Sequence, residues 1–180
     1  MTDTGNYLKI IKRKGCRELD KIMLRSMTSV YFVRGDHILC LFRIGSKVAD
    51  KLFVGAAGGH FEESELKDPE ACVLREIREE LGLLPEDISE LKLRYVTHRL
   101  MNGEIRQNYY YFAKLNREEP LRSTEGILRW VSSDEFPELP MPVSAKHMMM
   151  HYLECGQFTD VVYAGITEER GTDFIPLREF

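Results

Sequence analysis

Short apolar runs separated by turn-forming residues occupy most of the chain after residue 26 and predict a β-sheet. Six runs of strand length are rich in β-branched, aromatic or long aliphatic residues. Strands are therefore expected over 29–33, 37–42, 52–57, 91–99, 105–114 and 127–131, with a last edge strand over 161–164. Arg34-Gly35-Asp36 and Asn102-Gly103 are turn signals between paired runs, so each predicts a hairpin.

Two stretches show the 3.6-residue period of a helix instead. The first is expected over 69–81, because Asp68 is a good N-cap, Pro69 suits the first helical position and Gly82 suits the left-handed residue after the last turn. Its apolar stripe is formed by Val73, Ile77 and Leu81. The second helix is expected over 144–154, with Ser144 as its cap. Its predicted core residues are Ala145, Met148, Met149 and Tyr152.

Three glutamates of the first helix share one face. Glu76, Glu79 and Glu80 stand at i, i+3 and i+4, and like charges at this spacing cost about 0.2–0.5 kcal/mol per pair. Acids in a last helical turn also oppose the helix dipole. The arrangement makes chemical sense around a hard divalent cation, and oxygen ligands favour Mg²⁺ or Mn²⁺. The alternative is a solvated acidic face balanced by Arg75 and Arg78.

The residues in front of the helix favour the metal interpretation. Gly58 and Gly59 follow an apolar run and let the backbone approach a ligand closely. Together with the acidic helix, this stretch resembles the Nudix box, G-x5-E-x7-R-E-U-x-E-E-x-G-U, where U is a bulky aliphatic residue. The matching residues are Gly59, Glu65, Arg75, Glu76, Ile77, Glu79, Glu80, Gly82 and Leu83.

The match has one departure. Nine residues rather than seven separate Glu65 from Arg75, and the two extra residues are assigned to Leu66 and Lys67 because the helix start is unchanged. The usual pairing of the loop glutamate with the arginine is therefore open, and Glu62 or Glu63 is an alternative partner to Glu65.

The resemblance implies a Nudix fold, in which a mixed β-sheet lies between helices as an α/β/α sandwich. It also implies a pyrophosphohydrolase whose metal ligands are Glu76, Glu79, Glu80 and the carbonyl of Gly59. By the same resemblance Glu80 or Glu125 accepts the proton of the attacking water, and Arg75 orients the carboxylates. Glu125 matches a loop glutamate that MutT-like members carry shortly before a tryptophan, here Trp130.

The substrate is less well defined than the reaction. Arg43 and Lys51 are candidate contacts to phosphate or base, and surface charge is the alternative for both. Alternation places Tyr109 and Tyr111 on one face of their strand and Tyr110 and Phe112 on the other, so one pair is expected in the core while the other is free to stack a nucleobase.

Three functions follow from the resemblance, in order of preference. A MutT-like enzyme would cleave an oxidised purine nucleoside triphosphate such as 8-oxo-dGTP to monophosphate and pyrophosphate. The second is a sugar-nucleotide, ADP-ribose or dinucleoside-polyphosphate pyrophosphatase. The third is a non-catalytic module that binds a nucleotide, although such modules typically lose box carboxylates.

Composition narrows the class of protein. The 180 residues are 43% hydrophobic with a formal charge of −4, which fits one domain over 27–180 preceded by an extension over 1–26. Nothing in the charge balance indicates a polymeric nucleic acid as partner. Four cysteines without CxxC spacing, no signal sequence and no long apolar run predict a cytoplasmic protein that does not enter a membrane. A monomer and a homodimer both stay open.

Overall fold

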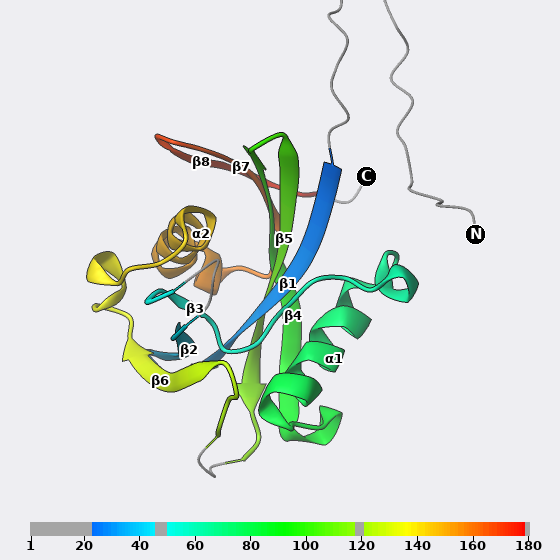
Figure 1. Ribbon diagram of the computed structural model, residues 1–180. Coiled ribbons are helices and arrows are strands. Elements are labelled where there is room, and N and C mark those ends of the chain that lie inside the picture. The colour runs from blue at the N-terminus through cyan, green and yellow to red at the C-terminus, as the bar shows by residue number, and fades with distance from the viewer. Residues whose placement is uncertain (1–22, 46–49, 118–120, 179–180) are drawn as a thin grey trace, which may run out of the picture.

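The computed structural model describes residues 23–45, 50–117 and 121–178 (Figure 1). Its strands are β1 (Met23–Arg34), β2 (His37–Arg43), β3 (Phe53–Gly55), β4 (Ile88–Met101), β5 (Glu104–Leu115), β6 (Gly126–Ser132), β7 (Tyr163–Glu168) and β8 (Gly171–Pro176). The helices are α1 (Pro69–Leu81) and α2 (Val143–Glu154). Short 3-10 turns are η1 (Glu63–Glu65), η2 (Pro85–Asp87), η3 (Phe136–Glu138) and η4 (Gly156–Phe158).

All eight strands belong to one mixed sheet. Its order is β3-β2-β1-β5-β4-β7-β8, with β6 added on β2. The predicted hairpins β1–β2 and β4–β5 are confirmed, and Asn102 and Gly103 take the positive φ values, 54° and 73°, that a tight hairpin turn needs. The long pairing at the centre of the sheet is parallel, unlike these antiparallel hairpins. It joins β1 to β5, with Met23 opposite Glu104 at one end and Phe32 opposite Ala113 at the other.

Strand β2 has three partners. Its first residues pair with β1 and its later residues with β3, while its other edge pairs with β6 over the whole length. The last pair in that register is Arg43 opposite Gly126, so the loops that follow β2 and precede β6 leave the sheet at the same point.

The two helices cover opposite faces of the sheet, as Figure 1 shows. Under α2, the buried residues Met148 and Met149 pack with Tyr31, Tyr110 and Phe112. Under α1, the predicted stripe of Val73, Ile77 and Leu81 packs with Val30, Phe32 and Tyr111. Each face therefore has its own hydrophobic core, and the predicted α/β/α sandwich is confirmed.

Burial on both faces corrects the prediction for the aromatic strand. Neither face of β5 is free at its centre, since Tyr110 and Tyr111 are 4% and 3% exposed. Tyr111 lies in the core beneath α1 and has no surface on which a nucleobase could stack. Tyr109, which is half-buried, packs its ring against Phe61 at 5.3 Å.

Several element ends differ from the prediction, and three of the differences change how an element is placed in the fold. Strand β1 begins at Met23, four residues before the expected start of the domain, and the proposed extension over 1–26 falls mostly outside the described residues. Helix α2 begins at Val143 after Pro142, and the buried Ser144 makes no cap hydrogen bond. The expected edge strand over 161–164 is instead β7, which lies between β4 and the true edge strand β8. Among the described helices none is long and apolar enough to cross a membrane.

Candidate active site

Helix α1 is fixed at both ends by the residues that predicted it. The Asp68 side chain accepts a hydrogen bond from the Ala71 N–H at 3.0 Å. At the other end Gly82 has φ 66° and its N–H donates to the Arg78 carbonyl. With the apolar stripe buried against the sheet, the glutamates are held along the side of the helix that faces the loop before it.

Arg75 joins that loop to the helix. Its Nε and Nη2 donate to Oε1 and Oε2 of Glu65 at 2.7 and 3.0 Å, and Nη2 also reaches the His60 carbonyl at 3.1 Å. Glu65 is 7% exposed, whereas Glu62 is 4.0 Å away from Arg75 with a 63% exposed side chain. Glu65 therefore keeps the pairing that the two extra residues left open.

The bidentate geometry also sets the charge of this pair. Hydrogen bonds from Arg75 lower the pKa of Glu65 to about 2, against the opposing effect of its burial. In return the Glu65 carboxylate raises the pKa of Arg75 above its ordinary value. Both groups are consequently charged across the physiological range, and the loop is anchored to α1 by an ion pair that is largely shielded from water.

The glycine pair lies between β1 and α1 where no side chain fits. A Cβ on Gly58, which has φ 152°, would come within 2.2 Å of the Thr28 carbonyl. A Cβ on Gly59 would stand 2.3 Å from Oε1 of Glu76. The Gly59 carbonyl accepts the Thr28 N–H at 2.9 Å, which leaves one lone pair of that oxygen for another partner.

The three box glutamates have different surroundings. Glu76 is 9% exposed and lies 2.9 Å from Nη1 of Arg75. Glu79 has a 58% exposed side chain and pairs with the same nitrogen at 3.0 Å. Glu80 accepts the Gly58 N–H at 3.2 Å. Arg75 and the glycine loop thus hold all three carboxylates in place.

Negative charge accumulates around Glu80. Burial raises the pKa of Glu80 to about 7, and the carboxylates of Glu125 and Glu76 act in the same direction. Burial likewise raises the pKa of Glu76. Glu125, from the loop before β6, forms an ion pair with Arg43 at the end of β2. The register of β2 with β6 thereby brings the predicted residues Arg43 and Glu125 together, and the effect of Glu125 on the pKa of Glu80 places this pair near α1.

Other predicted residues are not gathered there. Lys51 is exposed, with φ 57°, and its described contact is a backbone hydrogen bond to the Arg43 carbonyl. The Tyr109 hydroxyl donates to Gln107 at 3.1 Å, and Tyr111 is buried as stated above. Within residues 23–45, 50–117 and 121–178, no three His, Cys, Asp or Glu side chains are already grouped closely enough to hold a metal ion.

No feature of the sequence indicated the cluster of charged side chains that lies around His60, next to the glycine pair. His60 forms an isolated bridge with Met27, next to the β1–β5 pair that carries Arg25, Glu104 and Arg106. Burial and the charge of Arg25 lower the pKa of His60, and Arg106 contributes in the same direction. Only the parallel register of β1 and β5 brings these side chains together, and no local sequence signal gives that register.

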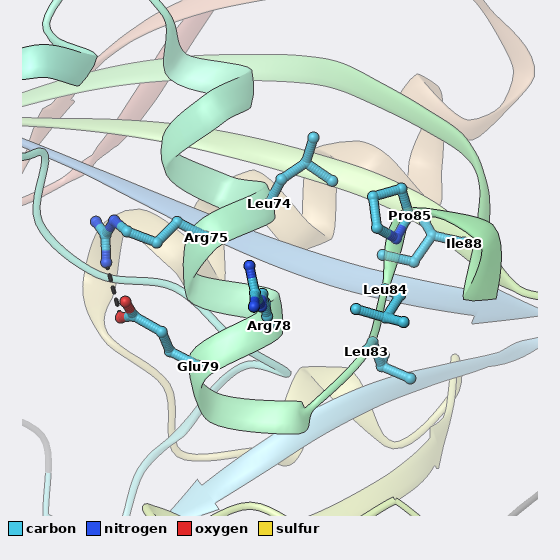
Figure 2. Close-up of a pocket in the computed structure, with 8 residues that line it drawn as sticks. All are labelled: Leu74, Arg75, Arg78, Glu79, Leu83, Leu84, Pro85 and Ile88. Carbon is cyan, nitrogen blue, oxygen red and sulfur yellow. Dashed lines mark hydrogen bonds and ion pairs between the residues drawn. The ribbon is translucent and has the colours of Figure 1, made fainter.

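A hollow of about 520 Å³ lies on the outer side of α1. Figure 2 shows its aliphatic residues, among them Leu83, Leu84 and Pro85, on one side and Arg75 turned toward Glu79 on the other. Glu76 and Glu80 do not line it. The hollow therefore borders the carboxylate face of the helix through Arg75 and Glu79 without reaching Glu76 or Glu80.

Comparison with known families identifies the protein family to which the chain belongs. The family model described as NUDIX domain matches residues 23–152, which include the glycine pair, the whole of α1 and most of the sheet. The chain belongs to the NUDIX family. The family and the complete set of box residues make it a Nudix pyrophosphohydrolase, whose substrates are small nucleotides. Comparison with curated proteins gives no match.

Several solved structures share the fold of this Nudix chain. A MutT protein from Bacillus halodurans is 22% identical with a TM-score of 0.59, over 84% of this chain and 94% of that one. A Caenorhabditis elegans Ap4A hydrolase is 13% identical with a TM-score of 0.59, over 77% and 100%. An ADP-ribose pyrophosphatase from Streptococcus suis is 14% identical with a TM-score of 0.55, over 79% and 98%. These likenesses establish the fold, and the names of the last two proteins give two different substrates.

Proposed function

We propose that this Nudix protein hydrolyses a nucleoside diphosphate linked to another group, with Mg²⁺ or Mn²⁺ as cofactor. The preferred substrate is a purine nucleoside triphosphate, including oxidised forms such as 8-oxo-dGTP, cleaved to monophosphate and pyrophosphate. The observation that carries the proposal is the glycine pair, which leaves room for no side chain and lies against Glu76 and Glu80, while the charge of Glu125 acts on Glu80.

The residues present fit a divalent cation. Their donors are carboxylate oxygens and one backbone carbonyl, which hard cations prefer. Burial is the main cause of the raised pKa of Glu80; the carboxylates of Glu125 and Glu76 add to it, and Arg43 acts in the opposite direction. Glu76, Glu79, Glu80 and the Gly59 carbonyl would hold the ion, and Glu79 would exchange its contact with Arg75 for it. When bound, the cation neutralises charge on the phosphate oxygens and lowers the pKa of a water molecule.

The protein's own groups supply the remaining steps. Glu80 or Glu125 accepts the proton of the attacking water, because Glu80 is bound to the Gly58 N–H and the Glu125 carboxylate lies near enough to raise the pKa of Glu80. Arg75 fixes the orientation of Glu76 and Glu79, and it is itself fixed by Glu65. Arg43 places a positive charge beside Glu125 and provides a contact for a substrate phosphate.

Two alternatives remain under this proposal. Sugar-nucleotide, ADP-ribose and dinucleoside-polyphosphate hydrolysis use the same metal chemistry, and proteins named for two of these activities share the fold. A non-catalytic nucleotide-binding module is the other. Retention of all three box glutamates, and of the Glu65–Arg75 pair that positions them, supports the enzyme over the module.

The experiment is phosphate and pyrophosphate release in Mg²⁺ with a panel of substrates. The panel contains 8-oxo-dGTP, ordinary nucleoside triphosphates, ADP-ribose, sugar nucleotides and dinucleoside polyphosphates, with Glu80→Gln as the inactive control. We expect turnover of triphosphates by the wild type and a rate at least ~100-fold lower for the variant. Turnover of another class alone would replace the preferred substrate. Silence across the panel, with nucleotide still raising the melting temperature, would support the binding module.

A further inference from the structure

Three arginines stand side by side across three strands. Arg25 on β1 is paired with Arg106 on β5, and Arg106 is paired with Arg99 on β4. Directly paired residues of neighbouring strands point to the same face of a sheet, so the three side chains share one face. Like charges placed directly opposite one another destabilise a sheet, which makes this arginine row costly without a partner.

The carboxylates nearby balance only part of this charge. Glu104 forms an ion pair with each of two arginines: its Oε1 lies 2.8 Å from Nε of Arg25, and its Oε2 lies 3.1 Å from Nε of Arg106. Among the described residues Arg99 has no acidic partner, and the terminal nitrogens of Arg25 and Arg106 have no acceptor. One carboxylate therefore pairs with two of the three guanidinium groups, and several N–H donors of the row are left without an acceptor among the described residues.

The row adjoins the glycine loop. His60, which follows the glycine pair, bridges to Met27, and Arg25 lies two residues before Met27 on the same face of β1, the face that carries Tyr31 under α2. Arg25 therefore lies about 7 Å from Met27 along β1, and the row across β1, β5 and β4 is about 10 Å wide. Helix α1 covers the opposite face, so the row and the carboxylates of α1 meet around the edge of the sheet at the glycine pair, which lies against Glu76. Figure 1 shows the start of β1 and the turn between β4 and β5 together at the upper end of the sheet, above the crossing of the glycine loop.

We infer that Arg25, Arg106 and Arg99 form a subsite for the far end of a phosphate chain whose near end lies at the carboxylate face of α1. Planar guanidinium forks match phosphate oxygens, and a row of three suits a chain with several charges better than one isolated anion. The inference rests on the proposed function and narrows its substrate class to nucleotides with three or more linked phosphates, over diphosphates such as ADP-ribose.

Calorimetric titration with inorganic tripolyphosphate in EDTA tests this subsite without the metal. We expect the wild type to bind tripolyphosphate more tightly than inorganic phosphate, with an affinity that falls as salt is raised. Arg99→Gln, which breaks no ion pair, should weaken binding about tenfold, equivalent to about 1.4 kcal/mol. Glu104→Gln should strengthen it several-fold, because it removes the one competing carboxylate; a purely structural role would not produce that gain.

The matched control is Arg34→Gln, at the opposite end of β1, where the guanidinium lies over the Trp130 ring. It should leave tripolyphosphate binding unchanged. Equal affinity for phosphate and tripolyphosphate, or equal binding by the Arg99, Glu104 and Arg34 variants, would overturn the subsite. Failure of the proposed function looks different: no substrate of the panel would be hydrolysed, while the arginine-dependent binding in EDTA would persist.

Discussion

Replacing Glu80 by glutamine should stabilise the metal-free protein at pH 8 while removing its activity. Glu80 lies among Glu76, Glu125 and a buried stretch of helix, and its pKa of about 7 exceeds the ordinary value of 4.5. The folded protein therefore holds a proton on this group between about pH 4.5 and pH 7 that the unfolded chain releases. Ionising Glu80 in the folded state costs stability, and glutamine avoids that cost while still accepting the Gly58 N–H.

The sign and size follow from linkage. Because the folded state binds more protons than the unfolded state in that window, the Glu80 contribution to stability falls as pH rises from about 4.5 to about 7. Each pH unit of difference between the two pKa values is worth about 1.4 kcal/mol, so the full cost above pH 7 is at most about 3.5 kcal/mol. Allowing for partial solvent exposure, we expect about 2 kcal/mol, or a melting temperature raised by about 4–8 °C.

Urea unfolding in EDTA at pH 4.5 and pH 8 measures the effect. The two proteins should be nearly equal at pH 4.5 and should diverge at pH 8. Glu79→Gln is the matched control, because this neighbour has a 58% exposed side chain and should give no gain at pH 8. Mg²⁺ should then stabilise the wild type more than Glu80→Gln, since only the folded wild type offers the full ligand set. A Glu80→Gln protein no more stable than wild type at pH 8 would refute the reasoning.

Two further substitutions test the supports of the site. Glu65→Gln should lower the free energy of unfolding by about 2–3 kcal/mol, because it leaves the Arg75 guanidinium against a neutral amide, whereas the exposed Glu62→Gln should stay within about 0.5 kcal/mol. Since Arg75 lowers the pKa of Glu65 to about 2, this difference should shrink as pH falls from about 4.5 toward 2; a constant difference would contradict the ion pair. Gly59→Ala should lower kcat at least ~10-fold with an unchanged circular dichroism spectrum, because the added Cβ would displace the Glu76 carboxylate 2.3 Å away. Wild-type kcat in that variant would show that the Glu76 position is not critical.

Local chemistry explains what the sequence predicted well. The ends of α1 depend on Asp68, Pro69 and Gly82, each of which acts within one turn of its own position. The Asn102-Gly103 hairpin is equally local, since both residues adopt positive φ. Such signals survive in any tertiary context, so the bounds of the helix were predicted correctly from the residues alone.

Long-range pairing explains what the sequence did not reveal. The alternation of β5 correctly separated Tyr110 from Tyr111, but a helix on each face buries both, and that depends on residues far along the chain. The β7–β8 hairpin beyond α2 follows from pairing with β4 rather than from a strong pattern of its own. The arginine row needs the parallel register of β1 with β5, which joins residues about eighty positions apart.

The turn between Glu62 and α1 is closed by its own hydrogen bonds. The Glu62 N–H donates to the Glu65 side chain, the Asp68 N–H donates to the Glu65 carbonyl, and Asp68 then caps the helix. Leu66 and Lys67, between these anchors, are exposed. The length of the loop is therefore uncoupled from the position of Arg75, and a fluorophore attached at residue 67 would label the start of α1 without replacing any group of the proposed site.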